Sequence, residues 1–336
     1  MDKHEPTAAA GRDQDILLQA RGIKKYFPSQ SSSIFKRQYI KAVDDVSFDV
    51  RRGETLGLVG ESGCGKSTLG RTIIYLYQPT AGQIVMDGQD LGQLKAGEMK
   101  AFRQKMQFIF QDPSASLNPR RTIRSILMEP FRIHQVGDKQ QREQRIRFLL
   151  DKVGLSEYHL SRYPHELSGG QKQRVGVARA LALNPELVIC DEAVSALDVS
   201  IQAQVINLLE DLQQEFGLTY LFISHNLGVI HHISDRVAVM YLGQMVELGS
   251  HDAIYDRTLH PYSQALISAI PDADPDQRRQ RILLTGDVPS PANPPSGCRF
   301  HTRCPYAEAV CSRETPAFTE AEPDHFVACH RFSART

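Results

Sequence analysis

A glycine-rich run, GESGCGKS at positions 60–67, constrains this chain more than any other feature of its sequence. The run follows a short apolar segment, TLGLVG (55–60), and opens the helix-like segment STLGRTIIYLY (67–77). Glycines let the backbone wrap tightly enough for several N–H groups to point at one anion, and a helix N-terminus adds a favourable dipole. The run fits the pattern G-x-x-x-x-G-K-[ST] in the expected context of strand and helix. The sequence therefore predicts a loop that binds the phosphates of a nucleotide.

Two side chains of this loop have distinct predicted roles. Lys66 brings a positive charge to the β- and γ-phosphates, and the hydroxyl of Ser67 is a candidate ligand of Mg²⁺. We expect the rest of the loop to contact the nucleotide as well, through Gly60, Glu61, Ser62, Gly63, Cys64, Gly65 and Thr68.

A second motif is the apolar run LVIC (187–190), which ends in two acidic residues. At the C-terminal tip of a buried strand, the carboxylate of Asp191 is suited to holding Mg²⁺. The next carboxylate points in another direction, so Glu192 is suited to orienting or deprotonating the attacking water.

A third motif, LSGGQ at 167–171, precedes that strand by about twenty residues. Ser168, Gly169, Gly170 and Gln171 would form a second anion site of backbone amides and a hydroxyl at a helix N-terminus. One nucleotide seldom needs two such sites within one polypeptide. We therefore expect a dimer in which this motif caps the γ-phosphate held by the other subunit's loop.

The order of these motifs resembles that of ABC transporter nucleotide-binding domains over residues 16–250. The resemblance implies that Gln111 binds Mg²⁺, senses the γ-phosphate and links to membrane subunits, and that His225 contacts the γ-phosphate. It also implies that the loop ending at Asp198 crosses the dimer seam and contacts the nucleotide. Phe27 matches the aromatic position that stacks on adenine, with Tyr26 as the neighbouring alternative.

Two positions depart from the pattern of this family branch. Ala193 stands where proline usually follows the Asp-Glu pair, and Asn226 stands where aspartate usually follows the histidine. Neither change removes a catalytic group, so the departures affect the stiffness of that loop and the polar surroundings of His225.

The flanking segments resemble the ATP-binding subunits of dipeptide/oligopeptide importers, in particular the second of their two paralogous ATPases. The segments that carry this likeness are FQDPSASLNPR, YPHELSGGQKQRV, HPYSQALISAIP and PSPANPPSGCRFHTRCPYA. The resemblance implies ATP hydrolysis that drives peptide import. The implied partners are a paralogous ATPase in a heterodimer, two transmembrane permeases and an extracytoplasmic peptide-binding protein. Related importers of nickel complexes or glutathione are an alternative.

Four of the six cysteines cluster near the C-terminus, namely Cys298, Cys304, Cys311 and Cys329. Four thiolates can hold an iron–sulfur cluster or a zinc ion, but tight C-x₂₋₄-C pairs typical of structural zinc are absent. Free thiols are a third possibility. The importer resemblance implies a [4Fe–4S] cluster. Because this segment is far in sequence from the nucleotide motifs, we expect it to serve folding or docking rather than hydrolysis.

The segment order predicts an α/β fold, and the resemblance specifies a RecA-like P-loop core with an antiparallel β edge and a helical insert. We predict a disordered leader at 1–15 and an ABC ATPase domain at 16–255, with the insert at about 112–168. A small cysteine-containing appendage of the peptide-importer type would occupy 256–336.

Charge and hydropathy limit the other possible functions. Lys+Arg and Asp+Glu both number 39, which gives no electrostatic reason to expect a nucleic-acid ligand. No run approaches the roughly 18 apolar residues of a membrane-spanning helix, and the polar N-terminus has no signal-peptide pattern. We therefore expect a peripheral subunit at the cytoplasmic face of the cell membrane. A soluble ABC ATPase acting on ribosomes or DNA is the rival, but the chain has neither a second cassette nor a long coiled coil.

Overall fold

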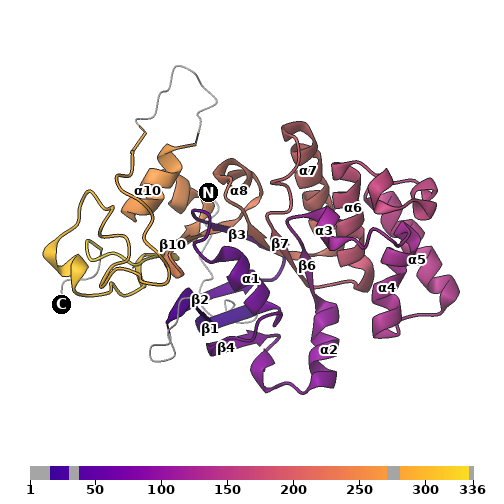
Figure 1. The fold of residues 1–336 in the computed structure, drawn as a ribbon, viewed down its shortest axis with the longest axis horizontal. Helices are drawn as coiled ribbons and strands as arrows, with labels where there is room; N and C mark the ends of the chain where they lie inside the picture. Colours follow the sequence, from indigo (N-terminus) through magenta and orange to yellow (C-terminus); the bar gives the residue numbers. More distant parts are fainter. Residues whose placement is uncertain (1–15, 30–37, 271–280, 333–336) are drawn as a thin grey trace, which may run out of the picture.

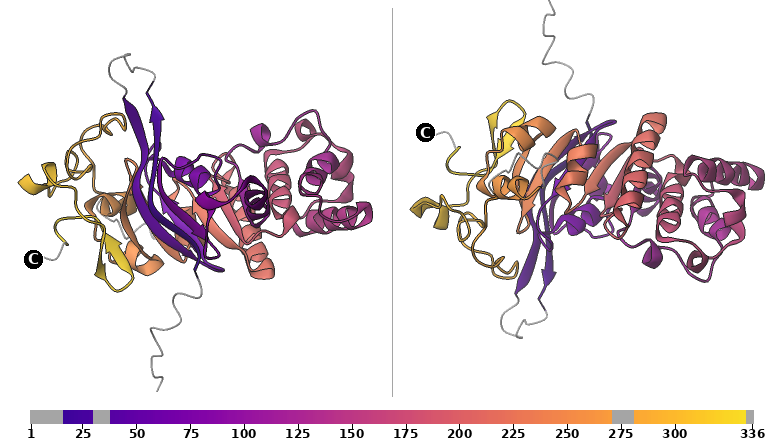
Figure 2. Two further views of the ribbon diagram at one scale, coloured as in Figure 1. Left: turned by 90° about the horizontal axis from the view of Figure 1, so that it is seen from below. Right: turned by 90° about the horizontal axis from the view of Figure 1, so that it is seen from above.

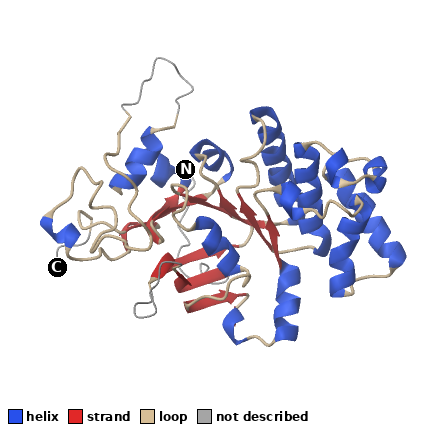
Figure 3. Cartoon of the chain, viewed as in Figure 1, coloured by secondary structure: helices blue, strands red, loops and turns tan. Residues whose placement is uncertain are grey.

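The computed structural model describes residues 16–29, 38–270 and 281–332. The predicted leader at 1–15 lies outside these residues. The described chain is of the predicted α/β class, with two sheets and a group of helices at one end (Figures 1 and 3). Figure 2 shows the C-terminal segment and this helical group at opposite ends of the molecule.

The central sheet has eight strands in the order β11-β12-β10-β9-β3-β8-β7-β6. Five neighbouring strands of this sheet, from β9 to β6, are parallel. They read as continuous apolar runs because a parallel sheet is covered on both faces. These strands are β3 (Thr55–Val59), β6 (Met106–Ile109), β7 (Leu187–Asp191), β8 (Thr219–Ile223) and β9 (Arg236–Tyr241).

The predicted antiparallel β edge is a second sheet with the order β2-β1-β4-β5. Helix α1 (Lys66–Ile73) contacts strands of both sheets and buries Leu69 and Ile73 completely. Each such side chain stabilises the fold by about 1.5–3 kcal/mol. The strands of this sheet are β1 (Ile16–Pro28), β2 (Tyr39–Arg51), β4 (Ala81–Met86) and β5 (Gln89–Asp90).

Helices fill the chain between β6 and β7, where the sequence predicts a helical insert. They pack around buried leucines and isoleucines on α4 and α5, including Ile126, Leu149 and Leu150. Helix α2, which precedes β6, lies below the sheet (Figure 1). The α-helices between β6 and β7 are α3 (Pro113–Ser116), α4 (Ile123–His134), α5 (Lys139–Lys152) and α6 (Gly169–Ala180), and α2 before β6 is Ala96–Lys105.

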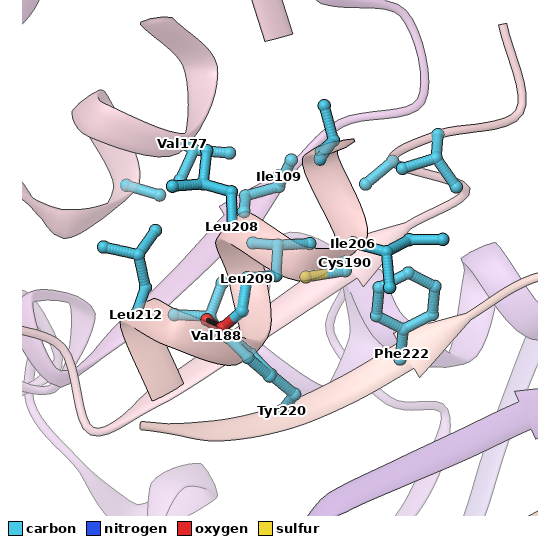
Figure 4. Packing of buried hydrophobic residues seen from close by; sticks show 14 of the residues in the cluster. Ile109, Val177, Val188, Cys190, Ile206, Leu208, Leu209, Leu212, Tyr220 and Phe222 are labelled. Carbon is cyan, nitrogen blue, oxygen red and sulfur yellow. Dashed lines mark hydrogen bonds between the residues drawn. The ribbon is translucent and has the colours of Figure 1, made fainter. Parts of the chain in front are cut away.

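Helix α7 (Val199–Phe216) covers one face of the sheet next to β7 and β8. Its residues Leu208, Leu209 and Leu212 belong to the same apolar cluster as Cys190 and Tyr220 of the sheet (Figure 4). Cys190 is completely buried there, as expected for a structural cysteine.

The C-terminal segment joins the central sheet instead of folding alone. Strand β12 pairs antiparallel with β10, and β11 pairs with β12. Phe300 is 1% exposed and packs against both Tyr241 and Tyr262, with ring centroids 5.3 and 5.4 Å away. The core thus extends into the C-terminal segment. The remaining elements are α8 (Leu227–Ile233), β10 (Gln244–Ser250), α9 (His251–Asp256), α10 (Pro261–Ser268), β11 (Thr319–Glu322) and β12 (His325–Val327).

None of the helices in the described ranges combines the length and the apolar character that crossing a membrane requires.

Candidate nucleotide site

The loops after β3, β6, β7 and β8 meet at one edge of the central sheet, because parallel strands end on the same side. This edge brings together Lys66, Gln111, Glu192 and His225 from four separate loops. A pocket of about 240 Å³ opens between Lys66, Gln111 and Glu192, and His225 lies outside its lining among the described residues. Its lining consists of Ile40, Ala42, Ser62, Gly63, Gly65, Lys66, Ser67, Thr68, Gln111, Glu192 and Pro291.

The glycines of the loop are required by its close packing. Gly65 has φ 108°, and a Cβ there would lie 2.0 Å from the carbonyl oxygen of Ala42. Gly60 has φ 152°, and its Cβ would lie 2.1 Å from the carbonyl oxygen of Met240. Since backbone cannot move aside as a flexible side chain can, only glycine fits at these two positions.

Lys66 lies buried at the base of the pocket. Its ammonium group donates hydrogen bonds to the carbonyl oxygens of Gly60 at 2.7 Å and Glu61 at 3.1 Å. The sulfur of Cys64 lies 3.9 Å from the same nitrogen. The loop therefore curls around the ammonium group of Lys66, a positive charge that can meet a phosphate.

Ser67 and Asp191 supply oxygen atoms next to each other. The Ser67 hydroxyl donates to Asp191 Oδ1 at 2.6 Å, and Arg71 lies 3.4 Å from Oδ2. Burial raises the pKa of Asp191, while the hydrogen bond from Ser67 and the charge of Arg71 lower it in part. Hydroxyl and carboxylate oxygens are the ligands that Mg²⁺ prefers, so this pair fits the ion.

Glu192 is held by residues from two neighbouring strand ends. Gln111 Nε2 donates to Glu192 Oε2 at 2.6 Å, and His225 Nδ1 lies 3.2 Å from Oε1. The backbone of Glu192 has φ 49°, a left-handed conformation that costs energy in a residue other than glycine. The Glu192 N–H also donates to the Ile223 carbonyl at 2.9 Å. This strained turn aims the carboxylate into the pocket and away from Asp191.

Not every predicted loop contact faces the pocket. Gly60, Glu61 and Cys64 are absent from its lining among the described residues. The Glu61 carboxylate instead pairs with Arg303. Cys64 is buried, and burial raises the pKa of its thiol, which makes it an unreactive packing residue.

The predicted adenine-stacking residue, Phe27, does not line the pocket in the described structure. Its ring meets Tyr77 edge to face, with centroids 5.4 Å apart. Its cross-strand partner Ile40 does line the pocket, so Phe27 lies on the correct face of β1. The alternative, Tyr26, hydrogen-bonds Asp44 through its hydroxyl.

The LSGGQ motif begins α6 and stays apart from this pocket. Ser168 Oγ accepts from Gln171 N at 3.3 Å, while Gln171 Oε1 accepts from Ser168 N at 2.9 Å, which forms a capping box. A Cβ on Gly170 would lie 2.6 Å from Ile201 Cγ2, so glycine at this position lets the first turn of α7 pack closely against α6. Asp198 is the N-cap residue of α7. Within the described chain, no residue of the motif lines the pocket of its own phosphate loop.

The two departures from the family pattern are accommodated locally. Ala193 is 2% exposed and packs in the main core. Asn226 caps α8, with its Oδ1 accepting from Gly228 N at 3.0 Å and from Val229 N at 3.4 Å. The site carboxylate that contacts His225 is thus Glu192.

The four C-terminal cysteines lie near one another but do not form a ligand set. The thiol of Cys298 interacts electrostatically with those of Cys304, Cys311 and Cys329, and burial raises its pKa to about 11. Over the residues described, no group of three or more His, Cys, Asp or Glu side chains is arranged to hold a metal ion. The geometry therefore does not support the predicted [4Fe–4S] cluster.

Sequence reasoning missed three residues that reach the phosphate loop from the C-terminal segment. The Glu61 N–H donates to the hydroxyl of Tyr262 at 2.9 Å, Arg303 pairs with the Glu61 side chain, and Pro291 lines the pocket. The C-terminal segment therefore contacts the phosphate loop despite its distance in sequence. No local pattern signals them, because Tyr262 and Arg303 lie 201 and 242 residues beyond Glu61.

Comparisons with known proteins agree with these motifs. Residues 43–195 match the family described as ABC transporter, and residues 246–311 match the oligopeptide/dipeptide transporter C-terminal region. The chain is 58% identical over 326 residues to the oligopeptide transport ATP-binding protein AppF of Bacillus subtilis, covering 96% of this chain and 99% of that protein. It is 53% identical to the putative oligopeptide transport ATP-binding protein YkfD of the same organism, with 94% and 95% covered.

Solved structures agree as well. The dimeric ATP-binding cassette MJ0796, described in a post-hydrolysis state bound to ADP and Pi, superposes with a TM-score of 0.63 at 28% identity. That similarity covers 70% of this chain and 99% of the cassette.

Proposed function

This chain belongs to the ABC transporter family of ATP-binding proteins, in the branch that carries the oligopeptide/dipeptide transporter C-terminal region, and on that premise we propose that it hydrolyses ATP to drive the import of peptides. The main support for the proposal is the position of Glu192, which lines the phosphate-loop pocket and contacts Gln111 and His225. The similarity to the oligopeptide transport ATP-binding protein AppF and the putative oligopeptide transport ATP-binding protein YkfD supports peptides as the cargo.

In the proposed reaction the phosphate loop binds and orients ATP. Lys66 and the amides of 60–67 would hold the phosphates, and Ser67, Asp191 and Gln111 would hold Mg²⁺. When bound, the ion neutralises charge that develops on the phosphate oxygens. Glu192 accepts a proton from the attacking water, and His225 fixes that carboxylate while contacting the γ-phosphate.

The pocket is completed by a second ATPase subunit. We propose that Ser168, Gly169, Gly170 and Gln171 of one subunit, with Asp198, cap the nucleotide of the other. The separation of this motif from the pocket of its own chain supports that arrangement, as does the dimeric state of MJ0796. We propose that the second subunit is a paralogous ATPase and that two permeases and an extracytoplasmic peptide-binding protein complete the transporter. The chain would lie peripherally at the cytoplasmic face of the membrane.

Co-purification with ATPase measurements tests this proposal. A tagged chain from its native host should retain a second ATPase and two permeases. The reconstituted complex should hydrolyse ATP faster when the peptide-binding protein and a mixture of short peptides are supplied. A homodimer that is fully active in transport would contradict the heterodimer, and stimulation by glutathione or a nickel complex in place of peptides would contradict the cargo.

For the C-terminal segment we propose that Cys298, Cys304, Cys311 and Cys329 bind a [4Fe–4S] cluster. The proximity of the Cys298 thiol to the other three supports this, and the side chains, which form no group of three metal ligands among the described residues, would have to rearrange around the cluster. Chain purified without oxygen should then contain iron and acid-labile sulfide. Stoichiometric zinc would contradict the cluster and indicate a four-thiolate zinc site. Protein without any metal would also contradict the cluster and show that the four thiols are free.

A further inference from the structure

The second residue of the phosphate loop is clamped by the C-terminal segment. Arg303 donates from Nη1 to Glu61 Oε2 at 2.8 Å and from Nη2 to Oε1 at 3.1 Å. The two parallel hydrogen bonds form the bidentate geometry that makes arginine–carboxylate pairs strong and directional. The Arg303 side chain is only 7% exposed, so water competes little for this pair.

The backbone of Glu61 is held on the same side. Its N–H donates to the Tyr262 hydroxyl at 2.9 Å, and the ring of Tyr262 is completely buried. The Glu61 carbonyl accepts from Lys66 at 3.1 Å. The residue fixed by Arg303 and Tyr262 is therefore the one whose carbonyl positions the lysine that meets the phosphates.

Charge gives this clamp a second effect. Glu61 places a carboxylate beside a loop that has to accept polyanionic phosphates, and like charges close together repel. The guanidinium of Arg303 neutralises that carboxylate, and the hydrogen bonds to Glu61 raise the pKa of Arg303. Without Arg303, the negative charge of Glu61 would oppose nucleotide binding.

We propose that Arg303 is a positioning residue for nucleotide binding, which makes ATP affinity depend on the docking of the cysteine-bearing segment against the phosphate loop. The inference rests on the proposed function of that loop as the ATP site. A second contact of the same segment supports it, because Pro291 lines the pocket and its carbonyl accepts from Lys41 N at 3.3 Å.

Titration of the purified full-length chain with Mg²⁺ and the fluorescent analogue MANT-ATP tests the inference. R303A should weaken binding about tenfold, within the range of coupling between linked sites. R303K should bind with intermediate affinity, because lysine keeps the charge but not the bidentate geometry. The matched control is R313A, which removes an exposed arginine of the same segment and should bind as the wild type does.

A double variant separates the effect of the unpaired charge from simple loss of structure. In R303A/E61Q no unpaired carboxylate lies beside the phosphate loop, so affinity should recover in part toward the wild-type value. In the assembled transporter, R303A should raise the KM for ATP with little change in kcat, and melting curves should show that the variant remains folded.

Each remaining outcome decides the question. Wild-type affinity in R303A overturns the inference while leaving the proposed function intact. A loss in R303A that E61Q does not relieve, in a variant whose melting curve shows a disrupted fold, also overturns it, because the effect would then come from that disruption. A wild-type chain that binds no MANT-ATP contradicts the proposed function itself.

Discussion

The side-chain amide of Gln111 donates a 2.6 Å hydrogen bond to the carboxylate of Glu192, across 81 residues of sequence. Gln111 follows β6 and Glu192 follows β7, and these strands are parallel neighbours. The bond therefore joins two loops that leave the same edge of the sheet. In the proposed mechanism, any movement of the Gln111 loop changes the orientation of the carboxylate that activates water.

Replacing Glu192 with glutamine should separate hydrolysis from binding. The amide keeps the size of the side chain but cannot accept the proton, so turnover should fall by roughly 100-fold or more. MgATP binding should persist and the closed dimer should accumulate, as measured by steady-state ATPase assays and size-exclusion chromatography. Lys66→Ala is the contrasting variant and should lose nucleotide binding itself. An E192Q complex that hydrolyses ATP at a near wild-type rate would show that another residue is the base.

Alanine at Gly65 should damage the loop far more than alanine at Gly63. Both glycines have positive φ, 108° and 78°, so both substitutions incur backbone strain of about 1–3 kcal/mol. Only at Gly65 does a Cβ also meet backbone, 2.0 Å from the Ala42 oxygen; at Gly63 nothing lies within 4 Å. Thermal melting and MANT-ATP titration should show a larger loss for G65A than for G63A. Equal losses would mean that strain alone, and not this contact, requires glycine.

His260 should make the fold less stable in acid. Burial lowers the pKa of His260 from its ordinary 6.5 to about 3, because the charged ring would lose its hydration. Between these values the unfolded chain binds a proton that the folded chain does not, so stability falls as pH drops from 6.5 toward 3. The loss is up to about 1.4 kcal/mol for each pH unit.

His260→Asn is the matched control for this pH dependence. Asparagine can still accept the hydrogen bond that Tyr262 N donates to His260 Nδ1 at 3.1 Å, but it does not titrate. Urea unfolding at several pH values should therefore show a flatter dependence in H260N. An unchanged slope would assign the acid sensitivity to other groups.

Cys304→Ser should remove iron and sulfide from anaerobically purified protein and lower its melting temperature. Because Arg303 is the adjacent residue and contacts Glu61, we also expect MANT-ATP affinity to fall. From distance in sequence alone, Cys304→Ser would be expected to leave the affinity for nucleotide largely unchanged. Substituting Cys64, a buried cysteine outside the cluster, should leave the iron content unchanged.

Sequence alone determined the local elements of the nucleotide site. The phosphate loop needs glycines and Lys66 at fixed positions within eight residues. The Asp191-Glu192 pair is identified by the apolar strand that precedes it. Such features follow from backbone geometry within a few residues, so their spacing along the chain is enough to identify them. The same holds for the α/β class, which the alternation of apolar strands and amphipathic helices predicts.

Tertiary structure decided which distant residues meet. The orientation of the Phe27 ring, the capping role of Asn226 and the arrangement of the cysteine thiols depend on packing that no local pattern specifies. The clearest case is Arg303, which reaches Glu61 because β12 pairs with β10 and because Phe300 packs against Tyr241 and Tyr262. Spacing in sequence fixes only the neighbours within one strand, turn or helix, whereas a contact across 242 residues exists only once the sheet and core have brought both segments together.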